Sequence, residues 1–232
     1  IFSIRFLKKL QQNFIILFSL FFYAFWNISF VLLILYFCIT TYLSIKKNDY
    51  LKSSIFLIIL PLVYFKYSSF LFNSLHLNNF SLLAYEGEIP LAISFITFTA
   101  IAAIVDTKKK IFDKNSVNFY SISEFILFFP QLIAGPILRL NELLPQLKNN
   151  ITFKKENIKF GLILFTIGFI KKIFFADNIG IFIDPIFENP EAFSNVSIFK
   201  SFILFPLQIY FDFSGYVDMA LGSSMIIGIE LP

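Results

Sequence analysis

The chain has 232 residues, of which 57% are hydrophobic, and it carries a net charge of +4. A soluble domain uses only about 45–50% apolar residues, so this composition excludes a soluble globular protein and predicts an integral membrane protein. The lysines lie in clusters between apolar tracts, which indicates membrane topology rather than nucleic-acid binding. The single cysteine, Cys38, excludes a disulfide framework and a cysteine metal site.

The first apolar tract, residues 14–45, lies between two groups of basic residues. A helix needs about 20 apolar residues to cross a bilayer, so the tract is short for two spans and long for one. A short hairpin that turns near Trp26 and Asn27, with both ends cytoplasmic, is one interpretation. A single tilted span is the other, and the sequence leaves both open.

Two further apolar tracts, residues 53–72 and 91–105, enclose a polar segment. The first of them is about one bilayer thick and carries Lys66 near its far end, where a lysine can reach the interface. The polar segment 73–90 lacks Lys and Arg, whereas segment 106–114 is rich in lysine. The positive-inside rule therefore places the former outside the cell and the latter in the cytoplasm.

The stretch "FFPQLIAGPILR", residues 128–139, contains helix breakers inside an apolar tract. Pro130 lacks a backbone donor, and Pro136 after Gly135 prevents a regular helix from continuing. Irregular backbone at membrane depth is tolerated only where it is buried in protein or lines a wet cavity. We therefore expect a break or re-entrant turn that faces a cavity, with Arg139 at its rim or at the cytoplasmic interface. A proline-kinked helix with an interfacial arginine is the alternative.

The apolar run 160–170 precedes Lys171 and Lys172. At 1.5 Å per residue it would extend only about 17 Å, which is too short to cross a bilayer. Either the two lysines lie in a protected polar cavity, or the helix is partial. Residues 176–193 are acidic and rich in turn-forming residues, so we expect them outside the cell.

The last apolar tract, residues 196–229, is interrupted by the polar run "QIYFDFSGYVD". A carboxylate near the bilayer centre costs several kcal/mol unless it is paired or hydrated, so an intramembrane Asp indicates a functional site. On a helix, Asp212 and Asp218 would be about 240° apart, so one would bind a structural partner and the other would line a cavity. Alternatively, both pair with Lys171, Lys172 or Arg139 and hold helices together.

The sequence contains no self-contained catalytic set. It has no G-x-S-x-G turn, no phosphate-binding P-loop and no metal-spaced His/Cys set. The single histidine, His76, lies in the polar segment 73–90 and is interpreted as a surface residue. No metal site is expected.

Several stretches resemble the membrane-bound O-acyltransferase (MBOAT) family, and within it the alginate and peptidoglycan O-acetyltransferase branch. The two that carry most of the resemblance are "FFPQLIAGPILRLNELLPQL" and "LQIYFDFSGYVDMALGSSMIIGIELP". Similar stretches follow the family's order at residues 19–26, 64–71, 90–106 and 168–177. Several motifs in one order over nearly the whole chain make a chance similarity improbable.

The resemblance implies a single all-α transmembrane domain over residues 1–232, part of a funnel-like fold with broken or re-entrant helices. It implies an enzyme of a bacterial inner membrane that passes an acyl group, such as the acetyl of acetyl-CoA, from the cytoplasm toward alginate or peptidoglycan. An extracytoplasmic acyltransferase is the implied protein partner, and no bound cofactor is expected. The alternative from another class is an ion-coupled transporter or channel, for which paired interrupted segments in the two halves would be typical.

The candidate site residues form a channel and scaffold set and a donor set. The channel and scaffold set is Gln131, Gly135, Pro136, Arg139, Gln208, Tyr210, Asp212, Ser214, Gly215, Tyr216 and Asp218. Lys171 and Lys172 could attract a phosphate-bearing donor, or they could be interfacial lysines.

Three features depart from the family pattern. The chain has no initiator Met, and the family's first transmembrane segment has no counterpart in it. Thr99 and Ala103 stand where the branch usually has Gln and Tyr. The family's catalytic histidine belongs to a Trp-x-x-Trp-His-Ile-Ser type motif that we expect beyond Pro232. These features predict a piece of a longer protein that is inactive alone.

Overall fold

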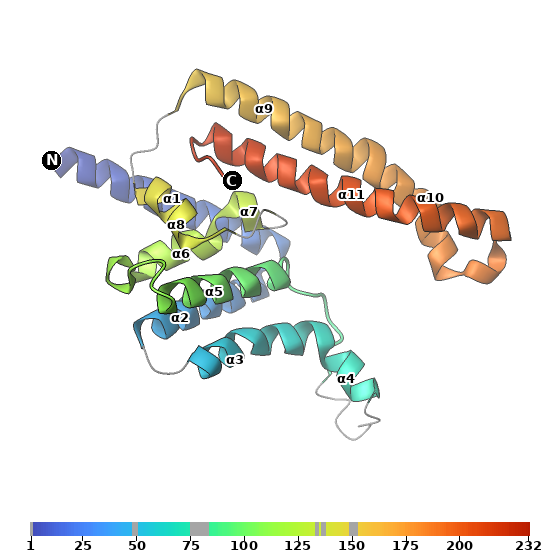
Figure 1. Ribbon diagram of the computed structural model, residues 1–232, viewed down its shortest axis with the longest axis horizontal. Helices are drawn as coiled ribbons and strands as arrows, with labels where there is room; N and C mark the ends of the chain where they lie inside the picture. The colour runs from blue at the N-terminus through green and yellow to red at the C-terminus, as the bar shows by residue number, and fades with distance from the viewer. Residues whose placement is uncertain (1, 48–50, 75–83, 133–134, 136–137, 149–152) are drawn as a thin grey trace. The chain divides into compact units, whose positions relative to one another are not determined.

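The computed structural model describes residues 2–47, 51–74, 84–132, 135, 138–148 and 153–232 (Figure 1). Every regular element within these ranges is helical, which confirms the expected all-α class. Two compact units can be distinguished, and each is described by itself. The first contains residues 1–133 and 137–150, and the second contains residues 134–136 and 151–232. The prediction of one domain over the whole chain stays a prediction.

The first unit is a bundle built around helix α5. Its helices are α1 (Phe2–Trp26), α2 (Val31–Lys46), α3 (Leu51–Leu62), α4 (Ser68–Ser74), α5 (Ile93–Lys108), α6 (Phe119–Leu127), α7 (Phe129–Leu132) and α8 (Leu140–Lys148), joined in part by the short turns η1 (Ile28–Phe30), η2 (Val63–Tyr67) and η4 (Lys114–Ser116). Helix α5 packs against α2, α3 and α6, and its buried side chains include Ile96, Ala100 and Ile104. It is therefore the core helix of this unit.

The first apolar tract is two helices rather than one tilted span. Helix α1 ends at Trp26, and Asn27 is extended, with φ −159° and ψ 117°. The Asn27 side chain accepts a hydrogen bond from the Ser29 amide at 3.0 Å, which is the N-cap interaction that starts a new helical segment. The break lies at the predicted turn of the short hairpin.

The second tract forms one continuous helical stretch, Leu51–Phe72, which is 22 residues long. Pro61 lies inside α3 and has no N–H to donate to the carbonyl of Leu57. The Tyr36 hydroxyl donates to that carbonyl instead, at 2.9 Å. The stretch widens into the π-helical turn η2 directly after the proline, so a neighbouring helix compensates for the donor that Pro61 removes.

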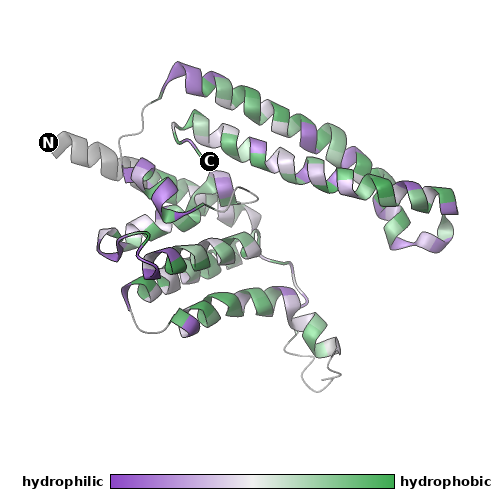
Figure 2. Cartoon of the chain, viewed as in Figure 1, coloured by the Kyte–Doolittle hydropathy of each residue, from purple (hydrophilic) through white to green (hydrophobic). Residues whose placement is uncertain are grey.

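Three helical stretches of the described chain are long and apolar enough to cross a membrane: Ile28–Lys46, Leu51–Phe72 and Asn195–Ile226. Hydrophobic residues cover most of the helical surface, while hydrophilic residues concentrate near several helix ends (Figure 2). Large apolar side chains such as Phe14, Phe56 and Phe199 are about two-thirds exposed, at 68%, 66% and 65%. Hydrocarbon is the solvent that tolerates such a surface, as expected for an integral membrane protein.

The second unit is a pair of long helical arms that pack side by side (Figure 1). The first arm runs without interruption through α9 (Lys155–Ile170), the π-helical η5 (Lys171–Asp177) and α10 (Asn178–Glu188), and after the turn η6 (Pro190–Ala192) the second arm is α11 (Asn195–Ile226). The helix that carries Lys171 and Lys172 is therefore not partial.

Residues 178–188, within the segment expected outside the cell, are helical, and the Asn178 side chain donates to the carbonyls of Ile173 and Phe174 at the end of the widened turn. Their location outside the cell stays a prediction. Helix α11 continues unbroken through the polar run that was expected to interrupt it. The run stays helical because its charges find partners and its glycine lies at a helix contact.

Glycines let the two arms approach each other closely. Gly161 and Gly168 on α9 are seven residues apart, as are Gly215 and Gly222 on α11. A Cβ added at Gly168 would lie 2.5 Å from the Gly215 carbonyl oxygen, and one at Gly161 would lie 2.6 Å from that of Gly222. Small residues at such contacts are typical of membrane helix pairs, which associate through packing.

We expect Gly168→Ala to destabilise the protein by about 1–2 kcal/mol, because the added methyl group meets backbone that cannot move aside. Denaturant unfolding in detergent micelles measures the change. Gly180→Ala is the matched control, since its Cβ would meet only the flexible tip of Gln208, at 2.8 Å. Equal stability of the two variants would show that the contact between the arms does not require a residue without a Cβ at position 168.

Candidate functional site

The stretch 128–139 breaks the helix, as predicted. Helix α6 ends at Leu127, and the four-residue helix α7 follows, with Pro130 in its first turn. A proline is accepted there because first-turn amides have no intrahelical acceptor. Leu138 and Arg139 are not helical, and α8 begins at Leu140. The alternative of a continuous kinked helix is therefore excluded, while the cavity next to the break stays a prediction.

Gln131 joins the two sides of the break. Its side-chain Nε2 donates to the carbonyl of Phe125 at 3.0 Å, one of the four α6 carbonyls that have no intrahelical donor. Gln131 is only 7% exposed, and its Oε1 has no hydrogen-bond partner among the described residues. Gly135 is buried as well, and Pro136 lies outside the described residues.

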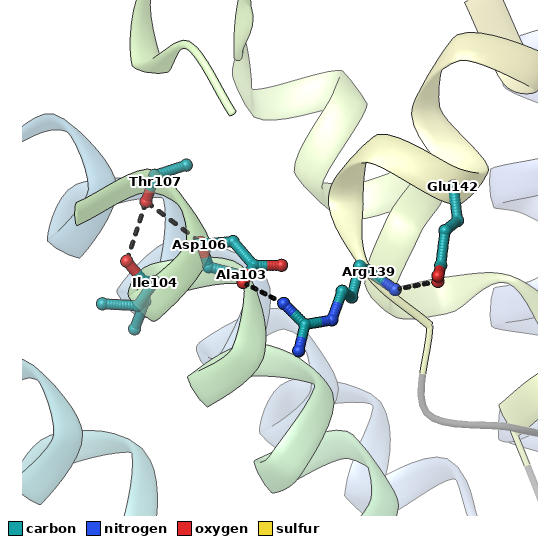
Figure 3. Close-up of polar contacts among 6 residues, drawn as sticks. All are labelled: Ala103, Ile104, Asp106, Thr107, Arg139 and Glu142. Atoms are coloured by element: carbon teal, nitrogen blue, oxygen red, sulfur yellow. Dashed lines mark hydrogen bonds and ion pairs between the residues drawn. The ribbon is translucent and has the colours of Figure 1, made fainter. Parts of the chain in front are cut away.

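Arg139 connects the end of the break to the core helix. Its Nη1 lies 3.2 Å from Oδ1 of Asp106, near the C-terminal end of α5 (Figure 3). Its backbone amide donates to Oε2 of Glu142 at 2.7 Å, which is half of a capping box at the start of α8. The Asp106 side chain is 5% exposed and that of Arg139 is 56% exposed. Arg139 thus holds α8 against α5 while its guanidinium remains accessible.

Sequence reasoning missed two buried carboxylic acids in the first unit. Asp106 was interpreted as the start of a cytoplasmic loop, yet it is 4% exposed and pairs with Arg139. Glu124, in the middle of α6, is 0% exposed. A carboxylate directly before the apolar run 125–129 was the signal that could have identified Glu124.

In the second unit, five charged side chains from two helical arms meet. Lys171 Nζ lies 2.5 Å from Asp218 Oδ2, and Lys172 Nζ lies 2.5 Å from Asp212 Oδ1 and 2.7 Å from Asp177 Oδ1. The structure therefore shows Asp212 and Asp218 paired with lysines, one of the two alternatives that the sequence left open. Paired charges of this kind hold two helices in register within an apolar environment.

The remaining candidates on α11 lie at varying distances from this cluster. The ring of Tyr216 lies 5.3 Å from Lys172 Nζ, and Gly215 is in contact with the first arm. Ser214 Oγ is buried without a hydrogen-bond partner among the described residues. Gln208 lies over Gly180, and Tyr210 is 60% exposed.

Within the described ranges, no group of three or more His, Cys, Asp or Glu side chains is placed to hold a metal ion. Four aspartates of the described chain, Asp106, Asp177, Asp212 and Asp218, are paired with lysine or arginine. The arrangement as described can shape and neutralise a polar region inside an apolar protein. It does not by itself assign a nucleophile or a general base.

Residues 13–231 match the model of the membrane-bound O-acyltransferase family. The chain belongs to this family. The match includes both the broken segment and the polar part of α11. Because the family is membrane-bound, the match agrees with apolar helices that cross a membrane.

Three curated relatives show the breadth of the similarity. The peptidoglycan O-acetyltransferase of Helicobacter pylori is 36% identical over 94% of this chain and 48% of its own length. The probable alginate O-acetylase AlgI of Pseudomonas aeruginosa is 30% identical over 96% of this chain and 45% of its own length. The teichoic acid D-alanyltransferase of Streptococcus thermophilus is 27% identical over 92% of this chain and 49% of its own length. The chain thus spans about half the length of these MBOAT relatives.

We expect Arg139→Gln to cost more stability than Asp106→Asn. Loss of the arginine leaves a 5%-exposed carboxylate without its cation, at a cost of about 1–3 kcal/mol. Loss of the carboxylate leaves a half-exposed guanidinium that water can solvate. Denaturant unfolding of both variants measures the difference, with Lys109→Gln, an exposed neighbour, as the charge-matched control. Equal or reversed costs would contradict the burial argument.

We expect Lys171→Asp and Asp218→Lys to destabilise the second unit individually and to restore stability when combined. Each single change places like charges together, whereas the double change reverses the pair that lies 2.5 Å apart. The coupling energy from the double-mutant cycle is the measurement. Lys155→Asp, at an exposed position of the same arm, is the control. Additive effects would show that the pair does not hold the helices.

Proposed function

We propose that this chain acts in the O-acetylation of a cell-envelope polysaccharide of the peptidoglycan or alginate type. The observation that carries the proposal is the family match over residues 13–231, together with 36% identity to a peptidoglycan O-acetyltransferase over 94% of the chain. In this proposal an acetyl group from a cytoplasmic donor such as acetyl-CoA crosses a bacterial inner membrane toward an extracytoplasmic acyltransferase partner. Peptidoglycan is the first acceptor to test.

The broken segment and the polar face of α11 have a structural role in this proposal. Gln131, Gly135 and Arg139 lie next to the helix break after α6, and a break at membrane depth needs protein or a polar space around it. On α11, Gln208, Tyr210, Ser214 and Tyr216 would border the acyl-transfer passage. We propose that each set shapes a polar region around its own segment and takes no part in bond making.

The charged cluster of the second unit holds the two helices together. Lys171 and Lys172 contact three carboxylates at 2.5–2.7 Å, so this role has more support than donor binding by the same lysines. Gly215 has a packing role in the same contact. Asp212 and Asp218 act as counter-ions of the lysines.

No general base is assigned within the described residues. An imidazole, which titrates near neutral pH, suits the activation of a hydroxyl acceptor. His76 lies outside the described residues, and we propose that it has no catalytic role. The family's catalytic histidine is expected in a motif that follows the "FDFSGY" stretch.

The acetate content of purified peptidoglycan tests the proposal. Cells that carry the gene for this chain and a matched deletion strain are compared after mild alkaline release of O-acetyl groups. We expect the deletion to lower acetate release at least tenfold and the gene supplied in trans to restore it. Unchanged acetate in all envelope polysaccharides, together with loss of solute uptake by membrane vesicles, would overturn the proposal in favour of a transporter.

The complementing gene with His76→Ala is the internal control. We expect its acetate release to stay within tenfold of the unmodified gene, a difference of under ~1.4 kcal/mol in activation free energy. A larger loss at unchanged protein level would contradict the surface assignment of His76 and make it a candidate base.

A further inference from the structure

Lysines from four segments of the first unit converge at one end of its bundle. Lys46 Nζ donates to the Lys114 carbonyl at 3.1 Å, and Lys108 Nζ donates to the Lys47 carbonyl at 3.1 Å. Lys148 Nζ donates to the Ser116 carbonyl at 2.8 Å. These contacts bring together the C-terminal ends of α2, α5 and α8 and the turn η4. Segments far apart in sequence therefore form one basic surface.

This surface contains a hollow of about 350 Å³, which we call the lysine pocket. It is lined by Thr107, Lys108, Lys110, Phe112, Asp113 and Lys114. The volume lies within the ~300–1,000 Å³ of small-molecule sites. The positive-inside rule accounts for lysines at this end of the bundle, but it does not require a hollow among them.

The charge in the lysine pocket is not neutralised from within. None of its three lysines forms an ion pair among the described residues, whereas Lys171 and Lys172 of the second unit both do. The one carboxylate of the lining, Asp113, accepts a hydrogen bond from the Asn115 amide at 3.0 Å. Lys108 uses one of its three donors on a carbonyl, which leaves two for a ligand.

Three consecutive backbone amides of the pocket segment, those of Lys110, Ile111 and Phe112, are already hydrogen-bonded. Lys110 has φ 58°, a left-handed conformation that a residue with a side chain rarely adopts. The amides of Ile111 and Phe112 donate to the Asp106 carbonyl, and the Lys110 amide donates to that of Thr107. A ligand would therefore not meet these three N–H groups, and the lysine ammonium groups carry most of its recognition.

We propose that the lysine pocket binds the phosphate group of an anionic ester. Lysine binds phosphate as a point charge without bidentate geometry, so the pocket selects a phosphate and not a particular molecule. Two sources carry this chemistry at a membrane surface: the headgroup of an anionic phospholipid and the phosphates of a soluble ester such as coenzyme A. The coenzyme A arm rests on the proposed function, because acetyl-CoA is its proposed donor. Both arms measure binding without turnover, so their failure is distinguishable from a failure of the acyl transfer.

The test uses the full chain with Lys108→Gln, Lys110→Gln and Lys114→Gln combined. In the lipid arm, native mass spectrometry counts the phosphatidylglycerol retained from nanodiscs that contain it alongside phosphatidylcholine. In the soluble arm, calorimetry measures the affinity for coenzyme A in detergent. We expect at least tenfold weaker binding in one arm, and the arm that responds identifies the source. High salt should weaken the same binding, since exposed charges are screened.

Two matched variants control for net charge and for folding. Lys154→Gln, Lys155→Gln and Lys159→Gln combined remove the same charge from exposed positions of the second unit, and we expect binding within twofold of the unmodified chain. Arginine at the three pocket positions keeps the charge and should keep the binding. Lys110→Gln alone, at an exposed position, should reduce binding about threefold without unfolding. Equal effects of the pocket and control variants in both arms would overturn the proposal.

Discussion

The structure depends on one constraint, that polar groups inside hydrocarbon need partners from the protein itself. Where a proline removes a backbone donor, a side chain from elsewhere replaces it, as Tyr36 does for the carbonyl of Leu57. Where helix α6 stops, Gln131 returns to cap the carbonyl of Phe125. At Pro61 and after Leu127, two breaks in the described chain, a side chain thus supplies a hydrogen bond that the helix itself cannot make.

The same constraint explains two different uses of charge. In the second unit, lysines and aspartates pair between helices that glycines allow to approach closely. In the first unit, Arg139 and Asp106 join the broken segment to the core helix. At the lysine-rich end of that unit, the ammonium groups instead contact carbonyls and leave their charge available. Neutralised clusters serve packing, and the unneutralised cluster is suited to an external anion.

Sequence reasoning succeeded where a local breaker decides the backbone. Asn27 and Pro130 each act on their own segment, so the turn after Trp26 and the break after Leu127 were predictable. It failed where polarity was taken for irregularity. The polar run of α11 is helical, because Lys171 and Lys172 supply partners for its aspartates. Those partners are distant in sequence.

Composition and motif order by themselves determined that this is a helical membrane protein of a known family. The membrane environment follows from the apolar content of the tracts, and the family follows from short motifs that can be read locally. The seven-residue spacing of Gly161 and Gly168 was also present in the sequence, but its meaning required a partner helix. Only the tertiary structure decided which carboxylate meets which cation, and that lysines of four segments meet at one end of the first unit. Ion pairs such as these form between segments far apart along the chain, so local pattern does not specify them.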